Sequence, residues 1–199
     1  MYLPEQFEET DPGRIASLVE NHPFGMLITV SQGQPFVSHL PFLFERSSGR
    51  KGRLIGHMAR ANPQWQHFGK AALAVFQGPH AYVSPSWYAS FGVPTWNYAV
   101  VHMKGKAVPV EGEALEKLLE KMTAAQESGR QNPWKLEDER LTKLFAMIVG
   151  FEIEITEIRA KFKLSQNRSL DDRTGVIGAL SELNDPNAVE LVKLMAGND

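Results

Sequence analysis

Runs of apolar residues predict that the first half of the chain forms short β-strands. The clearest run, 24–30, is a continuous stretch of apolar and β-branched residues, which is typical of a buried strand. A turn around Gly33 connects it to a second strand, 35–44, in which Pro35 and Pro41 favour an edge position or a local break. The remaining predicted strands are 53–58, 71–77, 80–84, 97–110 and 151–158, with a turn at 78–79.

Helical periodicity interrupts and follows these strands. One helix is predicted between Pro12 and Pro23, and a short one after Asn62, whose side chain is suited to cap it. Two more helices, at 112–128 and 136–149, carry leucines at the spacing of one helix face.

This pattern predicts a mainly β protein, a barrel with helical decoration. We expect one barrel domain over 1–168, with a helical insertion near 112–149. A C-terminal helical tail over 169–199 is expected to hold a helix at 186–195 and a frayed helix before it. With 43% hydrophobic and 22% charged residues, the composition is that of a globular protein.

Composition and charge exclude several kinds of site. The absence of cysteine excludes disulfides, thiolate metal sites and a cysteine nucleophile. The six histidines lack the spacing of metal ligands, so no metal is expected. A net charge of −2 supplies no general attraction to DNA. The acidic N-terminus and the lack of a long apolar run predict a cytoplasmic protein without a membrane span.

The most informative stretch is 56–65, where a predicted strand ends directly at a helix N-terminus. Unpaired backbone N–H groups at a helix start attract anions, and His57, Arg60 and Asn62 add donors at the same place. This combination predicts a phosphate cradle. The alternative is that Arg60 is an ordinary surface residue and His57 a core histidine whose hydrogen bonds are satisfied.

Three further stretches carry candidate chemistry. At 38–42 the strand broken by Pro41 would expose backbone groups to a planar polar ring, with Leu40 or Phe42 packing on its face. A lone histidine on a strand, such as His39, is more often structural. The loop regions of 78–98 are dense in aromatic residues, which could cover a flat ligand, a partner subunit or the barrel itself.

The segment 160–168 alternates basic residues with serine, glutamine and asparagine. These side chains could meet a phosphate or the polar edge of a ring, contact DNA, or form a solvated linker.

In this order, the motifs resemble the PaiB-like proteins. That family is described as FMN-binding negative transcriptional regulators, with the split-barrel fold of pyridoxamine-phosphate oxidase-like flavoproteins. The stretches that carry the resemblance are 1–4 with Phe7, 39–42, 56–63, 76–88, 93–98 with 101–102, and 161–167.

The resemblance implies an FMN-binding split β-barrel of the Greek-key type, which forms a homodimer with the flavin at the subunit interface. The implied FMN ligands are His39, Leu40, Pro41, Phe42, His57, Met58, Ala59, Arg60, Asn62, Trp96, Asn97, Lys163, Gln166 and Asn167.

The function implied first is negative transcriptional regulation, with DNA or another regulator as a further partner. Fold alone does not separate this from a flavin-dependent oxidoreductase of a small molecule, for which His39 and His80 are the acid–base candidates. A haem-binding split barrel is a further alternative.

Overall fold

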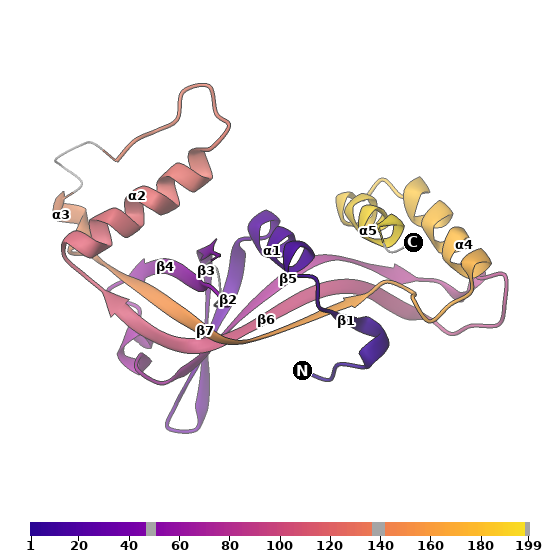
Figure 1. The fold of residues 1–199 in the computed structure, drawn as a ribbon, viewed down its shortest axis with the longest axis horizontal. Coiled ribbons are helices and arrows are strands. Elements are labelled where there is room, and N and C mark those ends of the chain that lie inside the picture. Colours follow the sequence, from indigo (N-terminus) through magenta and orange to yellow (C-terminus); the bar gives the residue numbers. More distant parts are fainter. Residues whose placement is uncertain (47–50, 137–141, 198–199) are drawn as a thin grey trace. The chain divides into compact units, whose positions relative to one another are not determined.

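The computed structural model describes residues 1–46, 51–136 and 142–197. It is mainly β-sheet with helices between and after the strands (Figure 1). The strands are β1 (Glu8–Glu9), β2 (Phe24–Ser31), β3 (Gln34–Glu45), β4 (Arg53–Ala59), β5 (Ala71–Val83), β6 (Thr95–Val110) and β7 (Ile148–Lys163). The α-helices are α1 (Pro12–Asn21), α2 (Glu113–Glu127), α3 (Thr142–Phe145), α4 (Leu170–Glu182) and α5 (Pro186–Ala196). Three short 3₁₀ helices are η1 (Glu5–Phe7), η2 (Pro63–His67) and η3 (Pro85–Trp87).

The strands form one sheet in the order β1-β7-β4-β3-β2-β5-β6, and a further pairing of β7 with β6 closes it. β2 runs antiparallel to β3 on one side and to β5 on the other. At the closing pair, a Cβ on Gly105 would meet the backbone carbonyl of Glu154. The two strands approach this closely because residue 105 has no side chain.

The chain divides into two compact units. Unit 1 comprises Met1–Leu18, Gln77–Val101 and Arg159–Asp199, and unit 2 comprises Val19–Phe76 and His102–Ile158. The long strands β5, β6 and β7 contribute residues to both units.

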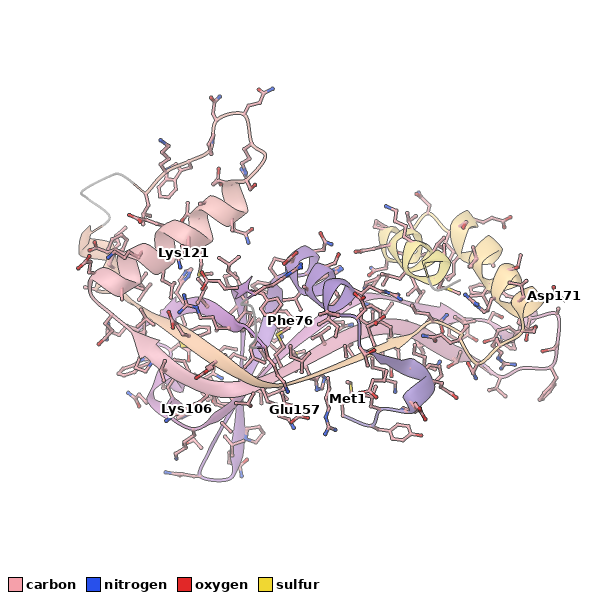
Figure 2. The ribbon with its side chains drawn as sticks, in the orientation of Figure 1. Met1, Phe76, Lys106, Lys121, Glu157 and Asp171 are labelled. Carbon is pink, nitrogen blue, oxygen red and sulfur yellow. The ribbon has the colours of Figure 1, made fainter. Side chains whose placement is uncertain are left out.

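An aromatic cluster fills the core of unit 2. Phe42 packs edge-on against Phe76, with ring centroids 5.3 Å apart, and against Phe151 at 5.8 Å. Phe68 meets Phe151 from another direction at 5.6 Å. Figure 2 marks Phe76 among the strands. Such edge-to-face contacts stabilise a core beyond the burial of apolar area.

Helix α2 covers the outer face of β4 in unit 2. One side of the helix packs on Ile55, through Leu115, Leu118, Leu119 and Met122. Lys121 on the same helix, labelled in Figure 2, donates to Glu45 of β3 (2.9 Å). Arg53 of β4 pairs with the same carboxylate, so the helix is fixed by both apolar and charged contacts.

In unit 1, the buried sides of α4 and α5 carry Val176 and Leu180, and Leu191 and Met195. The two helices lie side by side (Figure 1). Ser169 caps α4, its hydroxyl accepting from the backbone N–H of Asp172 (3.2 Å). α4 is therefore a complete helix, and the prediction of a frayed one was wrong.

Two other predicted elements were also wrong. Gly78-Pro79 is not a turn, because β5 continues through both residues. The pairing of β5 with β2 covers only Ala72–Val75 of β5. Pro79, which has no N–H, therefore removes no hydrogen bond from that pairing. Of the predicted helix 136–149, residues 137–141 lie outside the described residues, α3 is only one turn, and β7 already begins at Ile148.

The mainly β fold with helical decoration is confirmed, but β3 is not broken at Pro41, because it runs without interruption from Gln34 to Glu45. β3 pairs with β2 over Gln34–Pro41 and with β4 over Phe42–Glu45, so it changes partner directly after the proline. The division into a 1–168 domain and a tail stays a prediction. Within the described parts of the chain, no helix is both long enough and apolar enough to cross a membrane.

Candidate functional site

An exposed apolar surface covers one side of the β2–β3 hairpin in unit 2. We call it the apolar face; it consists of the cross-strand pairs Phe24–Pro41, Met26–His39, Ile28–Val37 and Val30–Pro35. Seven of these eight residues are apolar. Phe24 is 66% exposed, Val30 53% and Val37 46%. Exposed apolar surfaces of this kind mark places where a soluble protein meets a partner or a ligand.

His39 is the only polar residue of the apolar face, and it is exposed. Its ring stacks on Phe24, with centroids 6.5 Å apart and planes 25° apart. Successive residues of a strand point to opposite faces, so Leu40 lies on the other side of β3, with Ser38. The predicted ligands at 39 and 40 therefore do not share a surface.

Phe42 and Met58 do not reach a ligand from the surface. Each is only 2% exposed, and Phe42 is held in the aromatic core by Phe76 and Phe151. The expectation that the Phe42 ring would pack on a bound ring is wrong for the side chain. Alternation along β3 turns it into the barrel, on the side opposite to Pro41.

Several backbone N–H groups of the turn after β4, where the sequence predicted a phosphate cradle, are bonded within the chain. The N–H groups of Arg60, Asn62 and Gln64 are bonded to Met147 O, Ala59 O and Asn62 Oδ1. Pro63, the first residue of η2, has no N–H at all. η2 is a single short 3₁₀ turn, so it also lacks the dipole of a long α-helix. Three of the backbone donors predicted for the cradle are therefore bonded within the chain, and the phosphate cradle stays a prediction.

The side chain of Asn62 caps η2 and ties it to β3. Its Oδ1 accepts from Gln64 N (3.0 Å), and its Nδ2 donates to Ser38 Oγ (2.8 Å). Asn62 thus joins Ser38 and Leu40 on the side of β3 opposite to the apolar face.

Arg60 is engaged by protein acceptors. Its Nε donates to Ala146 O (3.0 Å), and one terminal nitrogen donates to Glu111 Oε1 (2.7 Å) and Ile148 O (3.2 Å). The Arg60–Glu111 pair is largely exposed, and such pairs contribute little to stability. A phosphate at Arg60 would compete with this carboxylate.

His57 retains an unused polar atom. Its Nδ1 is buried and makes no hydrogen bond within the described part of the chain. Burial lowers the pKa of His57, which favours the neutral imidazole at neutral pH. Buried polar atoms normally have partners, so this nitrogen can bond to a ligand. Ala59, two residues further along β4, is exposed.

Unit 1 contains an exposed aromatic cluster around Trp96, which is 53% exposed. The ring of His80 lies 6.3 Å from the Trp96 ring, and the ring of Tyr82 meets it edge-on at 6.1 Å. Lys163 donates to Thr95 Oγ1 (2.6 Å) and to Trp96 O (2.7 Å).

Lys163 stands among other positive groups. Its pKa is lowered by burial and by the charges of Lys161 and Arg168. Repulsion among these cations makes this part of unit 1 favourable for an anion.

The other predicted ligands of unit 1 differ in accessibility. Asn97 is fully buried, and its amide donates to Ser165 Oγ (2.9 Å). The side chain of Gln166 bonds to Leu164 N (2.7 Å) and Phe162 O (2.5 Å). Both side-chain amides bond to residues at or just after the C-terminal end of β7. Asn167, in contrast, is exposed. The sequence could not separate these roles, because amides serve backbone and ligand equally well.

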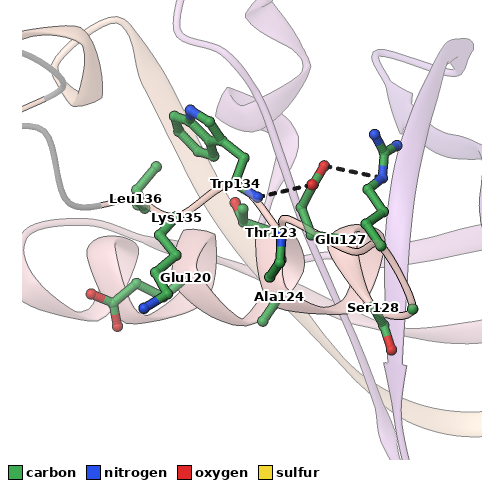
Figure 3. Close-up of a pocket in the computed structure, with 11 residues that line it drawn as sticks. Glu120, Thr123, Ala124, Glu127, Ser128, Trp134, Lys135 and Leu136 are labelled. Atoms are coloured by element: carbon green, nitrogen blue, oxygen red, sulfur yellow. Dashed lines mark hydrogen bonds and ion pairs between the residues drawn. The ribbon is translucent and has the colours of Figure 1, made fainter.

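A cavity of about 420 Å³ lies elsewhere, between α2 and the segment that follows it (Figure 3). Glu127 holds that segment, accepting from Trp134 N (3.0 Å) and pairing with Arg130 (3.5 Å). None of the predicted ligand residues lines it.

Residues 1–157 match the family described as "Putative FMN-binding domain". The chain belongs to this FMN-binding family. It is 42% identical over 200 residues to "Protease synthase and sporulation protein PAI 2" of Bacillus subtilis (strain 168), an alignment that covers 98% of this chain and 96% of the relative.

Solved structures share the fold at low identity. The FAD- and haem-binding protein of Mycobacterium smegmatis superposes with a TM-score of 0.65 at 17% identity, covering 84% of this chain and 78% of the other. The flavocytochrome Anf3 of Azotobacter vinelandii gives 0.61 at 16% identity, covering 78% and 69%. The predicted flavin-binding split barrel is thus confirmed.

The family makes FMN the cofactor, and the described residues suit its chemistry. FMN combines a flat apolar ring with polar ring edges and a phosphate. Within unit 2, the apolar face offers flat apolar surface and His57 Nδ1 an unpaired polar atom. Within unit 1, taken by itself, the Trp96 cluster offers aromatic surface and Lys163 a cation. The apolar face itself was missed by the sequence argument. Its signal was the run 24–30, rich in apolar and β-branched residues, which predicted a buried strand.

Proposed function

We propose that this chain is an FMN-binding homodimer that acts in negative transcriptional regulation, with its flavin bound at the subunit interface. The observation that carries the dimer is the apolar face. A strand side that carries several large apolar residues is normally covered by another layer. In β2 the inward side is buried, through Leu27 and Thr29, while Phe24 and Val30 on the outward side remain exposed.

A second copy is the occupant that fits the apolar face. A homodimer with twofold symmetry places the same patch of both subunits together, so the patch must complement itself. The apolar face meets that condition, because it carries no Asp, Glu, Lys or Arg side chain that would face its own copy. Beside it on β5, Leu73 pairs with Ile28 and is partly exposed, whereas Val75, which pairs with Met26, is buried.

We propose His39 and Phe24 as ring contacts, because they stack at the exposed surface where two copies would meet. His57 Nδ1 is proposed as a hydrogen-bonding partner, and Leu40, Pro41, Ala59 and Asn62 as neighbours. Arg60 is proposed as a phosphate ligand, with the phosphate replacing the Glu111 carboxylate as its ionic partner. When bound, FMN would supply one- and two-electron redox chemistry.

In unit 1 we propose Trp96, Lys163 and Asn167 as ligand-binding residues. Trp96 presents an aromatic face to solvent, and Lys163 brings a positive charge to the same strand ends. Asn97 and Gln166 are proposed to act indirectly, by holding Ser165 and the end of β7.

The regulatory role is supported by the family resemblance and by the name of the Bacillus relative, which refers to protease synthesis and sporulation. A net charge of −2 favours action through a partner regulator over direct contact with DNA. A cytoplasmic location stays a prediction.

The test is an FMN titration of the purified protein by flavin fluorescence, with the molar mass measured by light scattering in the same samples. One FMN bound per subunit of a dimer supports the proposal. A Soret band in the purified protein would favour haem instead. Absence of saturable flavin binding at tens of micromolar, or a monomer that binds FMN fully, would overturn the interface site.

Regulation is tested separately, with promoter DNA and with lysate from a deletion strain. DNA retention by the FMN-loaded dimer or by its complex with a second protein supports a regulator. Consumption of a reduced nicotinamide cofactor with a small-molecule acceptor, and no DNA retention in either form, would replace the regulator with an oxidoreductase.

A further inference from the structure

Helix α4, the first helix after β7, holds the aromatic loop of unit 1 from one side. The loop runs from Ser84 to Pro94, between β5 and β6, and includes η3. We call it the aromatic loop because it carries Trp87, Tyr88 and Phe91. The family match ends at residue 157, so the whole of α4 lies beyond it.

Asp172 makes the central contact. The residue is 1% exposed, and its carboxylate oxygens accept from the backbone N–H (2.9 Å) and the hydroxyl (2.7 Å) of Ser90. These two bonds lower the pKa of Asp172, so the carboxylate is charged at neutral pH. A buried carboxylate near a helix start could simply stabilise the helix, but both oxygens of Asp172 are used by the loop.

Arg168 makes a second contact with the loop. Its guanidinium lies 4.2 Å from the centre of the Tyr88 ring and donates to Phe91 O (3.1 Å). It also lies 3.9 Å from the Asp172 carboxylate. The contact therefore combines stacking, hydrogen bonding and charge, which the planar guanidinium allows.

Gly175 makes a third contact. A Cβ at this position would meet the backbone carbonyl of Trp87, so the loop packs directly on the helix surface. Two loop residues, Ser90 and Trp87, are thus held by the first two turns of α4, and two more, Tyr88 and Phe91, are held by Arg168, just before the cap of the helix.

The held loop leads directly into Trp96. Lys163 fixes the backbone there from β7, through Thr95 Oγ1 and Trp96 O. The ring of Phe91 remains 91% exposed although its backbone is held. The loop is therefore fixed in a form that leaves aromatic rings at the surface.

The geometry points to α4 as the positioning element of the aromatic loop, with Asp172 as the positioning residue that keeps Trp96 ready to bind the flat ring of the ligand. This inference rests on the proposed FMN function. By holding the aromatic loop, α4 reduces the conformational entropy that the loop loses when the ligand binds.

The test compares Asp172→Asn with Asp171→Asn in the full-length protein. Asp171 precedes Asp172 on the first turn of α4, is exposed, and is labelled in Figure 2. Both variants remove one negative charge from the same helix end, but only Asp172→Asn weakens the bonds to Ser90. Ser90→Ala removes the hydroxyl partner from the loop side.

Hydrogen exchange of peptides covering 84–95 is measured without flavin, and the FMN dissociation constant is measured by titration. We expect Asp172→Asn to speed exchange in this loop and to weaken FMN binding, each by at least about tenfold, while exchange in β2 and β3 stays unchanged. Asp171→Asn is expected to change neither. Adding Ser90→Ala to Asp172→Asn should give less than the product of the two separate effects.

Unchanged loop exchange in Asp172→Asn would overturn the positioning role of α4. Faster loop exchange with unchanged FMN affinity would show that α4 holds the loop but does not serve the ligand, which also overturns the inference. If the wild-type protein binds no FMN, the proposed function fails, and the exchange data identify this case separately because they require no flavin.

Discussion

The apolar face gives the sharpest prediction about this protein: Val37→Lys should separate the proposed dimer. Val37 lies in the middle of the face, directly opposite Ile28, and is 46% exposed. Its remaining exposed half would be covered only in the dimer. Full burial of a valine side chain contributes about 1.5–3 kcal/mol, so covering this half contributes about 1 kcal/mol in each subunit.

Twofold symmetry doubles this effect, because each dimer contains the position twice. The lost burial amounts to about 2 kcal/mol, or roughly a 30-fold weaker dimer. The unpaired ammonium groups add a desolvation cost, so about 30-fold is the smallest effect expected. FMN affinity should fall in the same variant if the flavin binds at the interface.

The assay is analytical ultracentrifugation over a range of protein concentrations, with circular dichroism to confirm that the variant folds. Val108→Lys is the matched control. Val108 is 40% exposed and lies on the same side of β6 as Lys104 and Lys106, since the three residues are two positions apart. It lies outside the apolar face. A dimer dissociation constant within about threefold of wild type for Val37→Lys would refute the reasoning, since a threefold change is below 1 kcal/mol.

Three further predictions concern stability. Asn62→Ala removes the η2 cap and the bond to Ser38 and should lower the free energy of unfolding by about 1–2 kcal/mol in a urea titration; an unchanged midpoint would contradict the role of the cap. Gly105→Ala should lower the melting temperature strongly, because its Cβ would meet the Glu154 carbonyl. Gly178→Ala, which has open space around it, should not; equal melting temperatures for the two variants would disprove the close approach of β6 and β7. Burial lowers the pKa of His57, so the unfolded chain takes up its proton first and stability should fall as pH drops through about 6.5. His57→Gln should flatten this slope in unfolding experiments between about pH 5 and 8, and an unaltered slope would show that His57 is not desolvated.

Much of the fold was predictable where local signals agree with the final packing. The apolar run of β2, the amphipathic pattern of α2 and the cap at Asn62 all depend on residues close together in the chain. The predictions failed where a distant partner decided the outcome. Gly78-Pro79 has the composition of a turn, yet β5 continues through it.

The candidate site was predicted less well than the fold. The motifs selected candidate stretches, but they could not say which residues of each stretch reach the surface. Phe42 is buried in the core, and the buried Asn97 amide donates to Ser165. The N–H of Gln64 donates to the Asn62 side chain that caps η2. The outcomes for Phe42 and Asn97 depend on partners that are distant in sequence, whereas the Gln64 bond is the local cap that the sequence had already predicted.

The sequence by itself determined the family, the sheet-forming segments and the chemistry available to them, because these follow from residue type and spacing. Only the tertiary structure decided which side of each strand faces inward. Strand alternation defines two faces but does not say which one points inward, and on β2 the side of Leu27 and Thr29 is no more apolar than the side of Phe24, Met26, Ile28 and Val30. The barrel can enclose only one of these faces, so Leu27 is buried while Phe24 and Val30 stay exposed. That choice, made by closure of the sheet, created the apolar face.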